Sequence, residues 1–114
     1  MIAHVVLFRP RPQLSGAERT ALVQVFARAL RDIPSIQRSQ VGKRVTHGRG
    51  YEQLMREKYE YAAVLEFKDV AGLKAYLEHP AHQALAERFF SSFEVALMYD
   101  YEMREGEAGL AGLL

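Results

Sequence analysis

The sequence predicts an α+β domain built on one four-stranded antiparallel sheet that carries its helices on one face. Short β-branched stretches alternate with amphipathic stretches in the order β-α-β-β-α-β. In the stretches expected to be strands, apolar residues repeat at every second position. This order of elements is that of the ferredoxin-like split β-α-β arrangement. We therefore predict one ferredoxin-like domain over residues 1–103 and a flexible C-terminal tail over residues 104–114.

The first half of the chain contains a strand and a helix with clear ends. Residues 2–9 are apolar and rich in β-branched side chains, which predicts a buried strand that Pro10 ends. Ser15 and Glu18 form a capping-box pattern, in which the Ser15 hydroxyl accepts from the Glu18 amide. The helix that follows is expected to end just before Pro34, because a residue that precedes proline avoids the helical region.

The second half of the chain predicts three strands and two further helices. The first of these strands is predicted over residues 36–45, where Gly42 would introduce a bulge or bend. Asp69 is a plausible N-cap, and Pro80 suits the first turn of a new helix because proline needs no hydrogen-bond partner there. The expected elements are a loop with one helical turn over 47–58, a strand over 59–67, helices over 70–78 and from 80 to about 90, and a strand over 94–103.

Composition narrows the class of protein. The chain has 114 residues, of which 49% are hydrophobic and 25% charged, and a single domain of this size can bury its own core. The net charge of +1 gives no reason to expect nucleic acid or a membrane surface as a partner. The absence of cysteine excludes disulfides and thiolate metal sites and is compatible with the cytoplasmic location that we expect. We predict no cofactor and no metal.

Both faces of the predicted sheet are apolar. In the strand over residues 59–67, Ala62 and Val64 point one way, whereas Leu65 and Phe67 point the other. A sheet that is apolar on both faces must be covered on both, and the helices can cover only one of them. A second copy of the sheet is the natural cover, so we predict a homodimer.

The run Tyr76-Leu77-Glu78-His79-Pro80-Ala81-His82 is the strongest candidate for a functional site. It places two histidines and a tyrosine within seven residues, and histidine can transfer protons near neutral pH. The structural alternative is that His79 caps the helix that Pro80 begins, while Tyr76 and His82 fill the core. A metal pair of His79 and His82 would need Glu78 or Glu87 to complete it, and Pro80 disturbs the helical register between them.

Four segments together resemble one known family. They are His4-Val5-Val6-Leu7-Phe8, Val41-Gly42-Lys43, Ala63-Val64-Leu65-Glu66-Phe67 and the run from Tyr76 to His82, in this order. Over about residues 1–103 the chain resembles the stress-responsive dimeric α/β-barrel (Dabb) family. The resemblance implies a ferredoxin-like α+β protomer that forms a barrel-like homodimer, which agrees with the prediction from the apolar pattern.

The resemblance also implies roles for particular residues. A plant polyketide cyclase of this family closes a linear chain by aldol condensation, and its acid/base pair falls at Tyr76 and His82 here. A histidine that lines its pocket corresponds to His4. A pocket tyrosine of that cyclase falls at Phe26, so the resemblance implies a pocket with one hydroxyl fewer in this chain.

We predict a ligand site in the space between the sheet and the helices. An apolar pocket with a few polar groups is the usual form of a small-molecule site. We expect a small, mostly apolar or aromatic ligand, with His82, Tyr76 and His4 as its polar contacts. The expected ligand-binding residues are His4, Val6, Phe8, Leu22, Phe26 and His79.

Three classes of function stay open on the sequence. The first is a binding protein without turnover, and the second is an acid/base enzyme such as a cofactor-independent, cyclase-like lyase that uses Tyr76 and His82. Isomerases and monooxygenases of similar fold belong to the second class by analogy only. The third is a structural dimer. A water-accessible His82 beside Tyr76 would favour the enzyme, and a filled core would favour the third.

Overall fold

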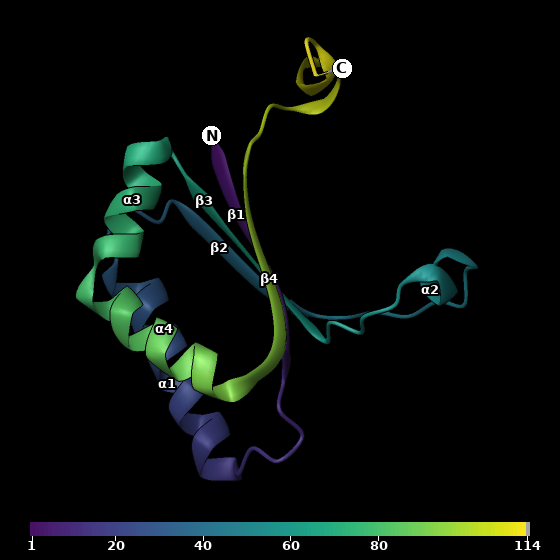
Figure 1. Ribbon diagram of the computed structural model, residues 1–114. Helices are drawn as coiled ribbons and strands as arrows, with labels where there is room; N and C mark the ends of the chain where they lie inside the picture. Colours follow the sequence, from purple (N-terminus) through teal and green to yellow (C-terminus); the bar gives the residue numbers. More distant parts are fainter. Residues whose placement is uncertain (114) are drawn as a thin grey trace.

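The computed structural model describes residues 1–113 and places three helices on one face of a four-stranded antiparallel sheet (Figure 1). Residue 114, the last of the predicted tail, lies outside the described residues. This architecture confirms the predicted ferredoxin-like fold. The elements are β1 (Ile2–Pro10), α1 (Gly16–Asp32), β2 (Arg38–Lys43), α2 (Tyr51–Leu54), β3 (Tyr61–Phe67), α3 (Val70–Glu78), α4 (Pro80–Ser92), β4 (Phe93–Glu102) and a 3-10 helix (Gly106–Leu110).

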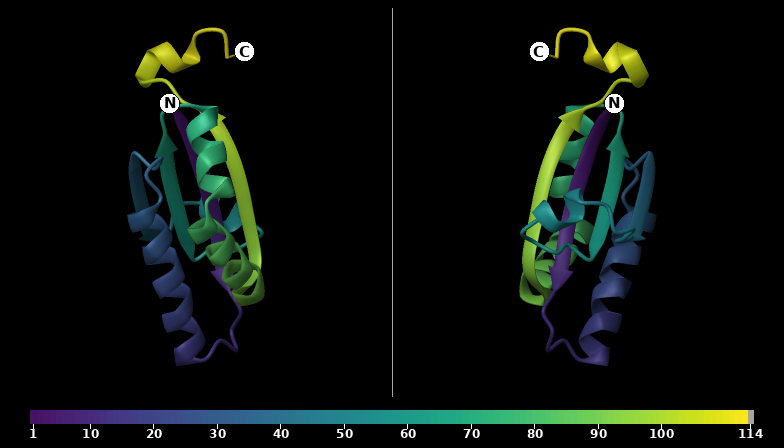
Figure 2. Two further views of the ribbon diagram at one scale, coloured as in Figure 1. Left: turned by 90° about the vertical axis from the view of Figure 1, so that its left-hand side faces the viewer. Right: turned by 90° about the vertical axis from the view of Figure 1, so that its right-hand side faces the viewer.

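The strand β1 lies in the centre of the sheet, whose order is β2-β3-β1-β4 (Figure 2). It pairs antiparallel with β3 and with β4, so that His4 lies opposite Leu65 on one side and opposite Asp100 on the other. Directly paired residues share a face of the sheet. The register therefore carries Asp100 to the same face as His4, which is the face that the helices cover.

Local signals start α1 and α3 where the sequence predicts. Ser15 is the N-cap of α1, and its Oγ accepts from the Glu18 amide at 3.1 Å. The Glu18 carboxylate accepts from the same hydroxyl at 3.2 Å. Asp69 caps α3 by accepting from the Gly72 amide at 2.9 Å. These caps satisfy amide groups that have no partner within their own helix.

The core lies between the sheet and the helices and is aromatic at its centre. The Phe8 ring lies 4.8 Å from that of Phe93 and 5.7 Å from that of Phe89, centroid to centroid. Phe67 and Leu65 are the largest side chains that are almost fully buried, and both belong to the inward face of β3. The alternation predicted for this strand is confirmed by its burial pattern.

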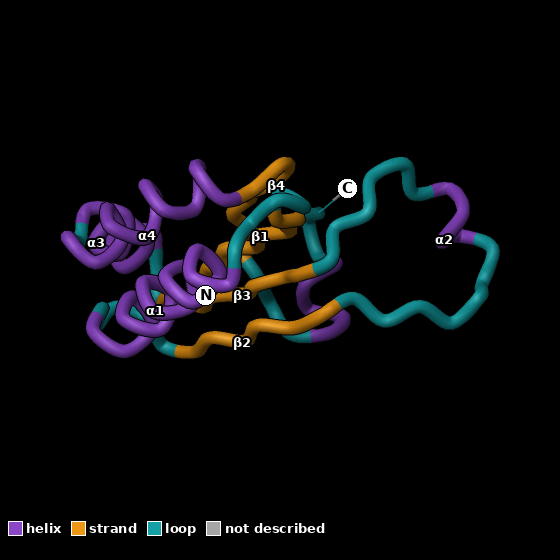
Figure 3. Tube along the Cα trace, turned by 90° about the horizontal axis from the view of Figure 1, so that it is seen from below, coloured by secondary structure: helices purple, strands orange, loops and turns teal. Residues whose placement is uncertain are grey.

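The strand β2 is shorter than predicted, and the chain beyond it leaves the body of the domain. Strand pairing stops at Lys43, and residues 44–60 form an extended arm with α2 at its tip (Figure 3). The arm projects on the side of the sheet opposite the helices. Its tip is folded on itself, because the Glu52 carboxylate accepts from the His47 and Gly48 amides at 3.2 and 2.6 Å.

The remaining residues of the predicted tail are described as far as 113. They include the 3-10 helix, and the Met103 amide donates to the Met1 carbonyl at 2.8 Å, which ties the start of this segment to the N-terminus. Its flexibility stays a prediction. Within residues 1–113, no helix has the length and apolar character needed to cross a membrane.

Candidate functional site

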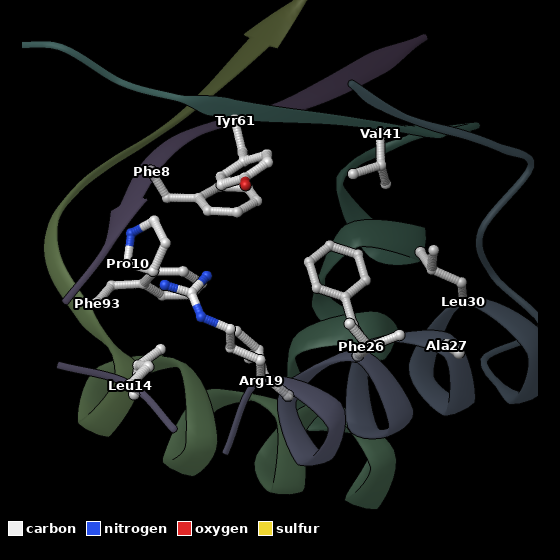
Figure 4. A pocket seen from close by; sticks show the side chains of 12 residues that line it. Phe8, Pro10, Leu14, Arg19, Phe26, Ala27, Leu30, Val41, Tyr61 and Phe93 are labelled. Atoms are coloured by element: carbon white, nitrogen blue, oxygen red, sulfur yellow. The ribbon is translucent and has the colours of Figure 1, made fainter. Parts of the chain in front are cut away.

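Two cavities lie between the sheet and the helices, and the larger has a volume of about 410 Å³ (Figure 4). It follows α1 along one face, from Arg19 in the first turn to Leu30 in the last. Its walls are apolar except for the Arg19 guanidinium and the Tyr61 hydroxyl. Of the predicted ligand-binding residues, Phe8, Leu22 and Phe26 line this cavity. The other lining residues were not predicted as ligand contacts, and they are Pro10, Leu14, Arg19, Val23, Ala27, Leu30, Val41, Tyr61 and Phe93.

The smaller cavity has a volume of about 120 Å³ and is lined by the predicted acid/base groups. His4, Tyr76 and His82 all line it, together with Val6. Phe26 lines both cavities, so its ring stands between the acid/base groups and the long apolar space. Since a water molecule occupies about 30 Å³ of liquid, the smaller cavity has room for a small reacting group or a few waters.

The break at Pro80 brings Tyr76 and His82 together. The helix α3 ends at Glu78, and His79 is the N-cap of the next helix, so the two rings come from different helices. Their centroids are 4.6 Å apart in an edge-on arrangement. Tyr76 is buried, and its hydroxyl forms no hydrogen bond with the residues that the structure describes. The hydroxyl is thus free to bond a molecule in the cavity.

His4 completes the polar side of the smaller cavity and is held by Asp100. His4 is only 6% exposed, and its ring lies 5.7 Å from the Tyr76 ring. Its Nδ1 lies 2.6 Å from Oδ1 of Asp100, and because a carboxylate can only accept, Nδ1 is the donor. The bond fixes the ring orientation and leaves Nε2 as the second polar atom of the ring.

Burial sets the protonation of the two groups contributed by the helices. It lowers the pKa of His82, the nearby His4 lowers it further, and the Leu77 carbonyl opposes this by favouring the charged ring. His82 is therefore neutral at pH 7. Burial raises the pKa of Tyr76 to about 12, and the negative charge of Asp100 adds to the increase. Tyr76 is thus a neutral hydrogen-bond donor, and His82 a neutral base.

The predicted site residues do not all lie in one place. His4, Val6, Tyr76 and His82 line the smaller cavity, and Phe8 and Leu22 line the larger. His79 lines neither, because its Nδ1 accepts from the Ala81 amide at 3.0 Å and caps α4. The structural alternative weighed for His79 thus describes its position better than a ligand contact does.

Asp100, Arg19 and Tyr61 are polar residues in or beside these cavities that the sequence analysis does not predict as site residues. Asp100 is the one acidic residue in the apolar stretch from Val95 to Tyr101, which is a detectable signal. Its meaning depends on the strand register, which the sequence does not give. Among residues 1–113, no three histidine or acidic side chains gather as a metal site would require.

Comparison with known proteins identifies the family. The family model described as the stress responsive A/B barrel domain, Dabb, matches residues 2–103. The chain belongs to the Dabb family. One curated relative is olivetolic acid cyclase from Cannabis sativa, which is 22% identical over 104 residues that cover 91% of this chain and 98% of the cyclase.

Solved structures with this fold are equally distant in sequence. The hydroxynitrile lyase of Passiflora edulis matches with a TM-score of 0.77 and 18% identity, over 92% of this chain and 94% of the lyase. A protein of Arabidopsis thaliana matches with a TM-score of 0.75 and 21% identity, over 94% of this chain and 99% of its own. A dimeric ferredoxin-like protein from Thermobifida fusca has a TM-score of 0.69 and 19% identity, with 90% of each chain covered. These likenesses establish the Dabb fold.

Proposed function

We propose that this Dabb protein binds a small, mostly apolar or aromatic molecule between its sheet and its helices. The larger cavity carries the proposal, because its volume of about 410 Å³ lies within the range of about 300–1,000 Å³ common for small-molecule sites. Its wall is apolar apart from Arg19 and Tyr61. The smaller cavity adds His82, Tyr76 and His4 as polar contacts on the other side of Phe26.

Binding can be measured with 4-hexylresorcinol, which joins an aromatic ring to an apolar tail. Isothermal titration calorimetry of the wild-type protein should show one saturable site per chain. Leu22→Trp would fill the larger cavity and should weaken binding about tenfold or more, whereas the same change at the exposed Val70 should have no effect. Equal affinities of all three proteins would contradict binding in this cavity.

Acid/base catalysis on the bound molecule is the second candidate function. The convergence of His82, Tyr76 and His4 on one small cavity favours it. Neutral His82 would take a proton next to a carbonyl group, and the Tyr76 hydroxyl would stabilise the enolate oxygen that forms. The names of two relatives, a cyclase and a lyase, agree with chemistry of this kind. The reaction that we propose is an aldol closure of the polyketide-cyclase type, without a cofactor.

The variant His82→Ala separates binding from catalysis. With a linear tetraketide-CoA as substrate, we expect turnover to fall about 100-fold or more, because a positioned general base contributes roughly this factor. The affinity for 4-hexylresorcinol should change less than about twofold. Tyr76→Phe should show the same pattern as His82→Ala. His79→Asn changes the other histidine of the run and should keep the activity. Equal losses of turnover and affinity in His82→Ala would contradict a catalytic role.

We also propose that the protein is a cytoplasmic homodimer. The two copies would meet through the open face of the sheet, which is the face that the helices leave uncovered. The residues Val5, Leu7, Val64 and Tyr99 lie on that face, as β1 pairs Val5 with Val64 and Tyr99. Figures 1 and 3 place the arm on the same side of the sheet, and Figure 1 also places the C-terminal segment there. A second sheet on this face would lie between the two projections. Structural relatives described as dimeric support the proposal.

A further inference from the structure

We propose that Arg19 makes the larger cavity selective for ligands that carry a carboxylate at one end of an elongated apolar body. The inference rests on the proposed function, because it concerns the same cavity. It goes further by naming the chemical class of the ligand and the residue that selects it.

The position of Arg19 is the first step. It belongs to the first turn of α1, and in Figure 4 its side chain extends from the helix toward Pro10 and Phe93. The residue is exposed, so its charge lies at a solvent-accessible end of the cavity. The residues of α1 that follow it along the cavity, Leu22, Val23, Phe26, Ala27 and Leu30, are all apolar. The only positive charge of the cavity is thus at one end of its α1 wall.

The charge of Arg19 has no partner within the described chain. No carboxylate of residues 1–113 lies within 4.0 Å of its guanidinium, whereas Arg9 pairs with Glu57 and Glu94, and Arg28 pairs with Asp32. A guanidinium presents a planar fork of donors that matches a carboxylate with two parallel hydrogen bonds.

The length and apolar lining of the cavity determine which ligand bodies can fit beside the carboxylate. Arg19 and Leu30 are eleven residues apart on one helix, which corresponds to about 16 Å of helix length. A ligand that binds Arg19 through its carboxylate must place the rest of its body along the apolar face of α1, toward Phe26 and Leu30. An alkyl chain, or a ring with an alkyl tail, fits this space, and a compact polar acid does not.

Decanoate and decan-1-ol form a matched pair of probes, since they share a chain and differ in charge. By isothermal titration calorimetry at pH 7.5, the wild-type protein should bind decanoate about tenfold more tightly than decan-1-ol. Arg19→Gln should remove this difference by weakening decanoate alone. Arg28→Gln is the control, because Arg28 lies on the same helix, outside the cavity.

The possible failures of the two proposals differ. If Arg19→Gln leaves decanoate binding unchanged, or weakens both probes equally, the selectivity by Arg19 is refuted and binding in the cavity stands. If decanoate, decan-1-ol and 4-hexylresorcinol all show no binding to the wild-type protein, both the proposed function and this inference are refuted. Leu22→Trp should weaken both probes, and binding that persists in this variant would place the ligands outside the cavity.

Discussion

The hydrogen bond between His4 and Asp100 joins a buried ring to a carboxylate that is 45% exposed. His4 alone could turn about its side-chain bonds, and a buried ring nitrogen without a partner is costly. The carboxylate removes that cost and fixes His4 beside Tyr76. It also contributes to the raised pKa of Tyr76, so one acidic side chain affects two of the three polar groups of the smaller cavity.

Removal of Asp100 should therefore lower stability by a measurable amount. In Asp100→Ala the Nδ1 atom of His4 stays buried without its partner, and we expect the free energy of unfolding to fall by about 1 kcal/mol at pH 7. Urea denaturation followed by circular dichroism measures this change. Glu102→Ala is the control, because Glu102 lies on the same strand and face, without a hydrogen bond from its side chain to residues 1–113. Equal effects of the two substitutions would contradict a special role of Asp100.

At the scale of the element, the break between α3 and α4 determines the geometry of the site. In an uninterrupted helix, side chains six positions apart point in directions that differ by about 120° around the axis and cannot meet. Pro80 starts a new helix instead, and the change of direction brings Tyr76 and His82 within 4.6 Å between ring centroids. The His79 cap is part of this break, because it satisfies an amide at the start of α4.

Two substitutions of His79 test its role as a cap. His79→Ala removes the acceptor for the Ala81 amide and should cost about 1 kcal/mol in the free energy of unfolding. His79→Asn supplies a side chain that is itself a good N-cap and should restore most of the loss. Thermal and urea denaturation of both variants gives the comparison. A loss of 4-hexylresorcinol binding in His79→Asn, at unchanged stability, would instead support a ligand contact.

The elements themselves could largely be predicted from the sequence, since their causes are local. The Ser15 and Asp69 caps, the Pro80 start and the alternation in β3 act over a few residues. The site could be predicted only in part. Tyr76 and His82 lie within one short segment, whereas the contact of His4 with Asp100 spans 96 positions and follows from the strand register alone. The division of the space into two cavities by Phe26 depends on packing and has no signature in the sequence.

At the scale of the whole molecule, the sheet has one covered face and one open face. The helices cover the side that carries His4 and Phe8, and both cavities lie there. On the open side, Leu97, Tyr99 and Tyr101 of β4 are 36%, 55% and 51% exposed. Soluble proteins rarely leave an apolar patch of this kind uncovered. The projection of the arm has no signature in the sequence, because the pattern of residues 47–58 predicts only a polar loop with one helical turn.

The arm also exposes apolar side chains that residues 1–113 leave largely uncovered. Val45 is 78% and Leu54 75% exposed, although the arm tip is ordered by the Glu52 carboxylate. At the base of the arm, Arg9 donates to the Lys58 carbonyl at 3.1 Å and pairs with Glu57. An arm that is braced in this way and projects beyond the open face is suited to contact a second copy seated on that face.

The substitution Tyr99→Glu tests the proposed dimer directly. In a two-fold interface the same face meets itself, so each dimer would bury two new carboxylates in an apolar contact, which is strongly unfavourable. By sedimentation at micromolar concentration, we expect twice the chain mass of 13.0 kDa for the wild-type protein and the mass of a single chain for the variant. Because Tyr99 is 55% exposed in the single chain, the variant should keep the circular dichroism spectrum of the wild-type protein.

The matched control for this substitution is Val70→Glu, which lies on α3, is 52% exposed and should remain dimeric. Dissociation of the control, or a dimer of Tyr99→Glu as tight as the wild type, would place the interface elsewhere.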